Sequence, residues 1–183
     1  SPRTAAADTL CAPMSDSKTP WETPPDGGDE MRPLPSHYQY CFGCGNDHPT
    51  GLHLQMTGGG DRVEGHLVVT EHHQGAPGLA HGGVIAAAMD EGMGFVLYLL
   101  ATPAVTARIE VDFRRPVPVG SKLELVGVID KVEGRKIWVT MSGSVGGVVA
   151  VESKALFLKV GVEHFIPHAQ RFGEERMERP YNP

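Results

Sequence analysis

Hydrophobic positions along the chain change their spacing twice, from every second residue to a helical spacing and back again. Apolar and polar residues alternate over residues 52–57 and again over 63–69, with the glycine-rich turn 58–61 between them. A period of two is typical of β-strands that bury one face. The pattern therefore predicts two strands joined in a hairpin.

An almost uninterrupted apolar run follows from Gly82 to Leu100, with Asp90 and Glu91 near its middle. A run of about 19 residues is long enough for a membrane span, but two central carboxylates would each cost roughly 2.5 to 3.5 kcal/mol in a bilayer. Its four glycines also weaken an isolated helix, so the helix depends on tertiary packing. We therefore expect a buried core helix and no membrane association.

Alternation with a period of two returns after the helical run. It covers four segments, and the last three are separated by the turn dipeptides Glu133-Gly134 and Gly146-Gly147; the segments are 106–113, 123–129, 137–142 and 148–160. A sheet with one apolar face needs cover, and the helix can supply it. The sequence predicts an α+β domain over residues 37–160, in which one long central helix is wrapped by an antiparallel sheet of about six strands.

The two ends of the chain lack any apolar period. Residues 1–36 are rich in Pro, Asp, Ser, Thr and Gly, and residues 161–183 combine charges with several prolines. Such compositions cannot bury enough apolar surface to form a core. We expect a disordered or loosely packed segment at 1–36 and a C-terminal tail at 161–183 with at most a short helix.

The composition of the chain argues against some classes of function. A formal net charge of −6 over 183 residues argues against binding to nucleic acid through phosphate contacts. Three cysteines are too few for a disulfide scaffold, and residues 1–30 hold no apolar signal segment. A reducing cytoplasm is the expected compartment.

The carboxylates inside the apolar run are the first candidates for chemistry, because an unpaired buried charge is costly unless it is paired, protonated or functional. Gly82 and Gly83 stand where the helix should begin, and a helix N-terminus offers free backbone N–H groups that a ligand can approach closely beside glycine. Such donors could polarise a carbonyl oxygen while a carboxylate activates water or attacks directly. The glycines could equally serve the tight turn into the helix, and the two interpretations are compatible.

Helix geometry separates the two halves of such a site. His81 and Asp90 are nine residues apart, which places them about 13.5 Å apart along the helix axis and on opposite faces. One helix cannot bring both groups to the same reacting carbon. The spacing therefore predicts a site that combines the helix start of one protomer with the carboxylate of another, in at least a two-fold dimer.

Four segments together carry a resemblance to a known family. They are Cys41–Asn46, Pro49–Leu52, Ala80–Gly83 followed by Asp90, and Thr106-Ala107 leading to Val111–Val117. In this combination the chain resembles the hotdog-fold acyl-CoA thioesterases, in their phenylacetate-pathway or thioesterase-superfamily branch, over about residues 38–160. The resemblance implies a hotdog fold, hydrolysis of an acyl-CoA thioester to free acid and CoA without a cofactor, and a role in fatty acid metabolism. It also implies homodimers or homotetramers, as dimers of dimers, whose thioester sites straddle the subunit interface.

The resemblance assigns roles to individual residues. Asp90 falls where the family has its general base or nucleophile, with Gly82 and Gly83 polarising the thioester carbonyl across the interface. Glu91 is about 100° away around the helix, and we expect it to pair with a cation or to lie at the oligomer interface. Thr106 falls where this branch commonly has a hydroxyl that orients the attacking water or holds the carboxylate, although a β-branched residue is also ordinary at a strand start.

Further residues are expected around the substrate. His81 is expected to orient the loop and the pocket rather than to act as the base. Because CoA carries phosphates, cations should lie near the mouth of the site, and the candidates are Arg114, Arg115, Arg135 and Lys136, each of which could instead be an ordinary surface charge. A non-catalytic acyl-CoA-binding protein is the alternative function. The helical carboxylate argues against it, because a binder gains nothing from a costly charge beside a thioester.

His37, Cys41, Cys44 and His48 raise a second chemistry, since a Cys-x-x-Cys pair with flanking histidines can bind zinc. The sequence has one such pair, and all four ligands would have to close around the metal within one short segment. The resemblance instead implies a packed loop leading into the first strand. We therefore expect no metal in this segment.

Overall fold

The computed structural model describes residues 29–168 and 170–171 of the chain. They fall into two compact units, one up to residue 160 and one from residue 161 onward. In the second unit, the short 3-10 helix Val162–His164 precedes helical residues 166–168. Most of the segment expected to be loose, residues 1–28, lies outside the described residues. The sheet and the central helix belong to the first unit.

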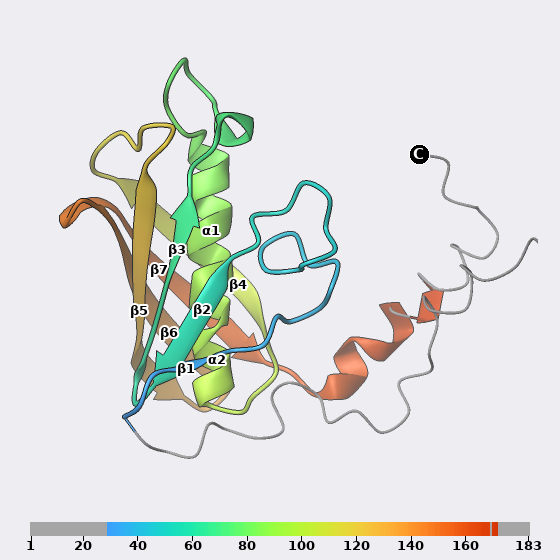
Figure 1. The fold of residues 1–183 in the computed structure, drawn as a ribbon. Coiled ribbons are helices and arrows are strands. Elements are labelled where there is room, and N and C mark those ends of the chain that lie inside the picture. The colour runs from blue at the N-terminus through green and yellow to red at the C-terminus, as the bar shows by residue number, and fades with distance from the viewer. Residues whose placement is uncertain (1–28, 169, 172–183) are drawn as a thin grey trace, which may run out of the picture. The chain divides into compact units, whose positions relative to one another are not determined.

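One antiparallel sheet of seven strands forms the framework of that unit (Figure 1). Its strands follow the order β1-β2-β3-β5-β6-β7-β4. Their bounds are β1 Arg32–Pro33, β2 Gln55–Gly59, β3 Arg62–Val68, β4 Ala104–Phe113, β5 Lys122–Glu133, β6 Lys136–Val145 and β7 Val148–Lys159.

Six of these strands correspond to the alternating segments of the sequence. The seventh, β1, is a two-residue strand that pairs with β2 and lies in the segment expected to be loose. β2 begins at Gln55, later than the alternation from residue 52 suggests. The reason is that the N–H groups of Leu52 and Leu54 donate to the carbonyls of Phe42 and Gly43 in the preceding loop, so they are not available to a strand ladder.

The predicted central helix is present as two consecutive helices, α1 at Gly82–Gly94 and α2 at Val96–Leu99, joined by Phe95. Beyond the junction, the N–H groups of Tyr98 and Leu100 bond three residues back instead of four. This tighter hydrogen-bonding pattern is common in the last turns of a helix.

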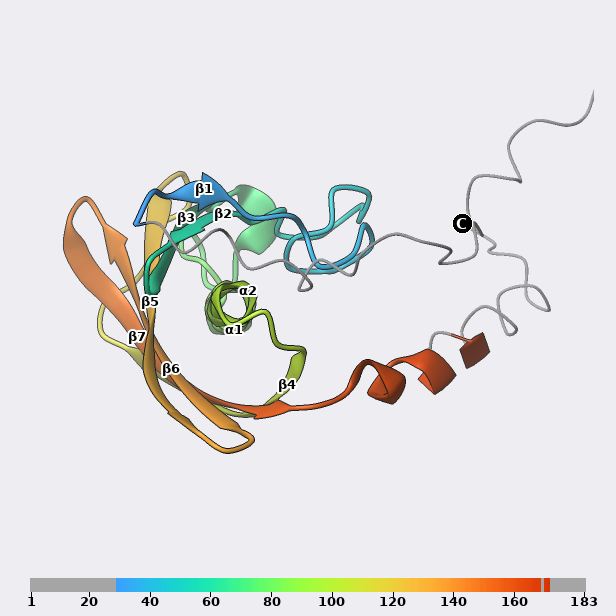
Figure 2. The same ribbon diagram turned by 90° about the horizontal axis from the view of Figure 1, so that it is seen from below.

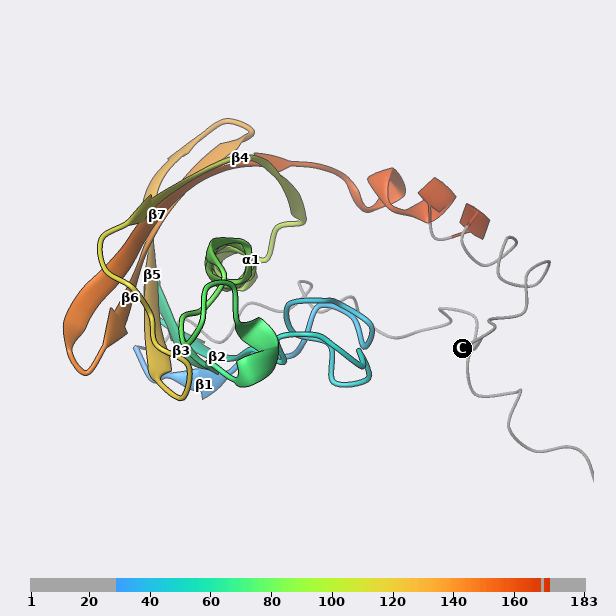
Figure 3. The same ribbon diagram turned by 90° about the horizontal axis from the view of Figure 1, so that it is seen from above.

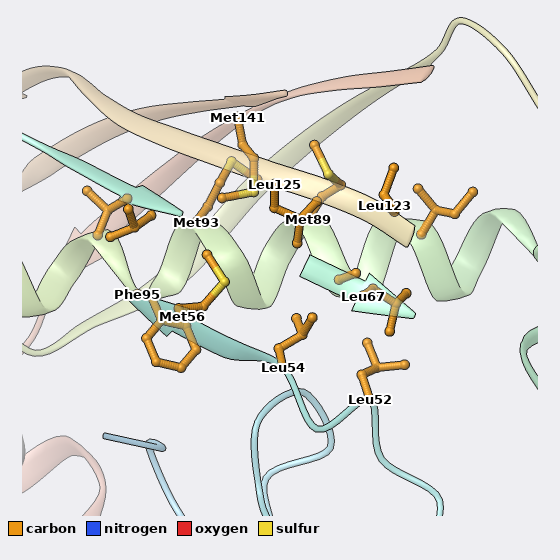
Figure 4. Packing of buried hydrophobic residues seen from close by; sticks show 14 of the residues in the cluster. Leu52, Leu54, Met56, Leu67, Met89, Met93, Phe95, Leu123, Leu125 and Met141 are labelled. Atoms are coloured by element: carbon orange, nitrogen blue, oxygen red, sulfur yellow. The ribbon is translucent and has the colours of Figure 1, made fainter. Parts of the chain in front are cut away.

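The helix lies in the concave face of the curved sheet (Figures 2 and 3). Buried side chains from both layers fill the space between them (Figure 4), among them Met56, Leu67, Met89, Met93, Phe95, Leu123, Leu125 and Met141. A Cβ added at Gly92 would lie 2.8 Å from the Met141 side chain. Glycine at that position therefore lets the helix come close to β6.

Burial explains the apolar character of the helical run. By length and composition Gly82–Leu99 could cross a membrane, but half of it is buried inside the protein. A helix that is apolar nearly all round is typical of a core element.

Candidate active site along the central helix

The N-terminus of α1 offers one free backbone donor. His81 is the N-cap, and its Nδ1 accepts from the Gly83 N–H at 2.9 Å. The next two N–H groups, of Val84 and Ile85, donate to the His81 carbonyl. Within residues 29–168, the Gly82 N–H has no hydrogen-bond partner. Of the two glycines singled out in the sequence, Gly83 has its donor occupied and Gly82 does not.

The cap also explains what His81 does. Because its Nδ1 accepts a hydrogen bond, a neutral His81 carries its proton on Nε2. Its own backbone N–H donates to the His73 carbonyl at 2.8 Å, which joins the helix start to the 3-10 helix Glu71–His73. Through these two hydrogen bonds His81 links the preceding loop to the first turn of α1.

The carboxylate of Asp90 lies further along the same helix, against β4. Thr106 Oγ1 donates to Asp90 Oδ1 at 3.0 Å. Burial raises the pKa of Asp90 above its usual 3.8; the Thr106 hydrogen bond lowers it in part, and the nearby charge of Glu91 raises it further. The side chain is only half-buried, so water can reach the carboxylate.

The Gly82 N–H and the Asp90 carboxylate lie at opposite ends of strand β4. A Cβ at Gly82 would lie 3.5 Å from the Phe113 ring, at the end of β4, whereas Asp90 bonds Thr106 near its start. Eight residues of helix separate Gly82 from Asp90, about 12 Å along the axis. Within one chain the free N–H and the carboxylate therefore do not meet.

The four candidate cations are also divided between the two ends of β4. Arg114 and Arg115 follow Phe113. Arg135 lies in the β5–β6 turn, where its carbonyl accepts from the Lys159 N–H, and Lys136 is the first residue of β6. Arg114 is paired with Glu152 and Asp112. Lys136 lies over the Trp138 ring at 6.0 Å, and Arg135 Nε donates to the Lys159 carbonyl at 3.4 Å. Arg115 is exposed and has no ion-pair partner in the described part of the chain.

A second cluster of reactive side chains lies on another face of α1. Glu91 Oε1 is 2.7 Å from His37 Nδ1, and the Cys41 sulfur donates to Glu91 Oε2 at 3.5 Å. The Cys44 sulfur lies 3.5 Å from His37 Nδ1. Glu91 therefore pairs with a residue that can be cationic, as expected. His48, the fourth ligand considered from the sequence, is elsewhere, with its ring edge on Phe42 at 5.4 Å between centroids.

These contacts shift the pKa values of His37, Cys41 and Cys44. Burial by itself would lower the pKa of His37, but hydrogen bonds with Cys41 and Glu91 outweigh it and raise the pKa to about 9. Hydrogen bonds from Cys44 and His37 lower the pKa of Cys41 to about 3. Hydrogen bonding with Cys41 and burial raise the pKa of the Cys44 thiol above its usual range.

Sequence reasoning could not have placed Glu91 in this cluster. It lies 47 residues beyond Cys44, and no spacing rule connects a loop cysteine to a carboxylate on a distant helix. Gly43 gives the only hint, and only once the fold is known. A Cβ at Gly43 would lie 2.3 Å from Glu91 Cδ, so a glycine is needed where the helix side chain meets the loop.

Comparisons with known proteins agree with this architecture. Residues 77–143 match the model of the thioesterase superfamily. Acyl-coenzyme A thioesterase THEM4 of Xenopus laevis is 32% identical over 89 residues, which are 48% of this chain and 40% of the relative. Acyl-coenzyme A thioesterase THEM5 of Mus musculus is 33% identical over 92 residues, which are 49% of this chain and 37% of the relative. The chain thus matches less than half the length of these relatives.

Solved structures show the same fold. A thioesterase superfamily protein superposes with a TM-score of 0.62 at 29% identity, over 66% of this chain and 60% of that protein. A hypothetical thioesterase protein of Streptococcus pneumoniae, solved with coenzyme A, gives a TM-score of 0.53 over 55% of this chain and 80% of that protein, and its 17% identity makes it evidence for the fold alone. With one central helix against an antiparallel sheet, the chain has a hotdog-like fold, and its residues 77–143, which include Gly82 and Asp90, are similar to the thioesterase superfamily.

Proposed function

We propose that the protein hydrolyses acyl-CoA thioesters, using Asp90 of one copy and the Gly82 N–H of another. The observation that carries the proposal is the Asp90 carboxylate, half-buried on the core helix and held by Thr106. A carboxylate in that position is costly to a protein that only binds its ligand. The partial matches to acyl-coenzyme A thioesterases support the substrate class.

The reaction follows from the groups on α1. The Gly82 N–H, at the positive end of the helix dipole, donates to the thioester oxygen and stabilises the charge that develops there. Asp90 either removes a proton from a water molecule that attacks the carbonyl carbon, or attacks that carbon itself to form an anhydride that water then hydrolyses. In both routes the C–S bond breaks and CoA leaves as the thiol or thiolate. Thr106 holds one carboxylate oxygen, Oδ1, and leaves Oδ2 for the reaction.

Strand β4 supplies the surface through which two copies would share the site. It is ten residues long and lies at the end of the strand order, with β7 on one side and no strand on the other among the described residues. A long unpaired edge is a template for pairing with another chain. Antiparallel pairing of two β4 edges centred on Glu110 would set Phe113 of each copy across from Ala107 of the other, next to Thr106. Gly82 of one copy would then stand beside Asp90 of the second.

The same pairing would gather the candidate cations. Arg115 follows Phe113, and the β5–β6 turn lies beside the start of β4, because Ala104 pairs with Lys159 and Lys159 bonds Arg135. In a two-fold pair, the Arg115 end of one copy meets the Arg135 end of the other. Cations separated in one chain would then stand near one mouth, where the phosphates of CoA need them.

A hydrolysis panel tests the proposed activity. Short, medium, long and aromatic acyl-CoAs are incubated with the full chain, and the released CoA thiol is followed with a chromogenic thiol reagent. We expect turnover of at least one class, and turnover at least roughly 100-fold slower by the Asp90→Asn variant. Binding of acyl-CoA without turnover by the wild-type protein would contradict hydrolysis and support the non-catalytic alternative.

A further inference from the structure

The connection between β1 and β2 poses a problem of stability. It runs through residues 34–54 without helix or strand. Loops of more than about 12 to 15 residues with no secondary structure are uncommon in compact domains. In Figures 2 and 3 this loop lies beside α1, on the side away from β5, β6 and β7. It needs an attachment to the helix that does not depend on a strand ladder.

The cluster around Glu91 provides that attachment. His37, Cys41 and Cys44 come from the loop and Glu91 from α1, and one ligand atom of each lies within 4.8 Å of all the others. Two ligands on a tetrahedral Zn²⁺ are roughly 3.3 to 3.8 Å apart, given bond lengths of about 2.0 to 2.3 Å. The Cys41–Glu91 and Cys44–His37 contacts, both 3.5 Å, already have this spacing. The 2.7 Å His37–Glu91 contact would need to open by about half an ångström.

The backbone of the loop is built around the same four side chains. Gly43 lies between the two cysteines, and its missing Cβ is what allows Glu91 to reach them. The His37 N–H donates to the Cys44 sulfur at 3.2 Å. Backbone N–H donors to ligand sulfur are a common way of orienting metal-bound cysteines.

The surroundings of the cluster exclude water on the helix side. Cys44 is 2% exposed. The His37 ring lies 4.7 Å from the Phe95 ring and stacks on Tyr98 at 5.1 Å. The Tyr98 hydroxyl is buried and, in the described part of the chain, has no hydrogen-bond partner, so an unsatisfied polar group accompanies the ring that packs on the cluster.

We propose that His37, Cys41, Cys44 and Glu91 form a Zn²⁺ site that ties the loop 34–54 to the middle of α1. Two cysteine sulfurs, an imidazole and a carboxylate are ligands that zinc prefers, and four protein ligands close its coordination, as in structural sites. Asp90 lies on another face of the helix, so the proposed hydrolysis does not involve the metal. The expectation that this loop holds no metal was based on His48 as the fourth ligand. In the folded chain Glu91, and not His48, lies with the other three side chains.

Metal content is the direct test. The full chain is purified without a metal-affinity tag and without chelators, and zinc is measured against protein by elemental analysis. We expect about one zinc per chain. Replacement by Co²⁺ should give the intense visible bands of a tetrahedral site and a near-ultraviolet charge-transfer band from cysteine thiolates. A wild-type protein that holds no zinc and takes up neither metal would show an empty hydrogen-bonded cluster and overturn the proposal.

Variants separate this site from adventitious binding. Cys44→Ser and Glu91→Gln should each lower zinc affinity at least about tenfold, and Cys44→Ser should weaken the charge-transfer band. His48→Ala removes a nearby histidine outside the cluster and should keep one zinc per chain. Loss of zinc in His48→Ala with retention in Glu91→Gln would refute the ligand set. The result on the wild-type protein decides the proposal even where a cysteine variant fails to fold.

Stability gives an independent readout that needs no substrate. A metal bound only by the folded state stabilises it, so a strong chelator should lower the melting temperature of the wild-type protein by about 5 °C or more. The same chelator should leave Glu91→Gln nearly unchanged. An equal melting temperature with and without chelator in the zinc-loaded wild-type protein would contradict a structural role.

Discussion

The carboxylate of Asp90 is half-buried, stands beside a second acidic residue and is held by one hydroxyl. Replacing it by Asn keeps the shape and removes the base or nucleophile, so kcat should fall roughly 100-fold or more. Because burial disfavours the charged form of Asp90, the melting temperature of Asp90→Asn should be equal to or above that of the wild type. Kinetics and thermal unfolding measure both effects. Asp61→Asn, in the exposed β2–β3 turn, is the matched control and should keep full activity.

Thr106 should control the pH at which Asp90 works. A base acts only when deprotonated, so kcat/KM should fall as the pH drops through the raised pKa of Asp90, above the usual 3.8. Thr106→Ala removes a hydrogen bond that favours the charged form. The acidic limb of the pH–rate profile of Thr106→Ala should therefore move to higher pH, whereas Thr106→Ser should keep the wild-type profile. Superimposable pH–rate profiles for Thr106→Ala and wild type would mean that Thr106 does not hold the catalytic carboxylate.

At the scale of an element, the first turn of α1 allows its donor to be removed without disturbing the helix. Gly82 is the first helical residue, and the preceding His81 has an extended backbone with ψ of 135°. Proline is favoured at a first helical position and requires an extended residue before it. Gly82→Pro therefore removes the free N–H and should lower kcat roughly 100-fold, with the fold retained by circular dichroism.

Gly82→Ala is the matched variant. It keeps the N–H, and its Cβ would meet the Phe113 ring at an ordinary contact distance of 3.5 Å. We expect Gly82→Ala to retain most of the activity. If both variants lost activity to the same extent, the loss would come from crowding near Phe113 and not from the missing donor.

At the scale of the whole molecule, the separation of Gly82 from Asp90 leads to a complementation test. Inactive Gly82→Pro chains are mixed in equal amounts with inactive Asp90→Asn chains under conditions that allow subunit exchange. A mixed dimer has one site with both lesions and one intact site, so random mixing should restore up to roughly a quarter of wild-type activity. Mass spectrometry of the intact dimers confirms exchange. Exchange without recovered activity would mean that each site is built within one chain.

Local patterns in the sequence sufficed for much of this fold. The alternating segments mark six of the seven strands, and the apolar run marks the central helix, because both depend on which residues face a core. The strand β1 was missed because two residues are too few to show a period. The start of β2 was misplaced because Leu52 and Leu54 are buried by a loop and not by a strand.

Candidate residues on the helix itself could also be named from sequence. Asp90 and Gly82 stand out because a carboxylate is costly in an apolar run and because a glycine pair precedes it. Helix geometry alone shows that the two cannot meet within one chain. These inferences need only local structure, which the residues along one element specify.

Only the tertiary structure decided the contacts between distant segments. In the folded chain the Gly83 N–H donates to His81 and the Thr106 hydroxyl donates to Asp90. Glu91 contacts a loop that begins more than 50 residues earlier in the chain. The sequence could place His37, Cys41 and Cys44 together but named His48 as their partner. A spacing rule sees neighbours along the chain, whereas a ligand set is chosen by whichever side chains the packing of loop against helix brings within reach. The sequence by itself therefore determined the elements and the chemistry available on each, and the folded chain determined which of those groups come into contact.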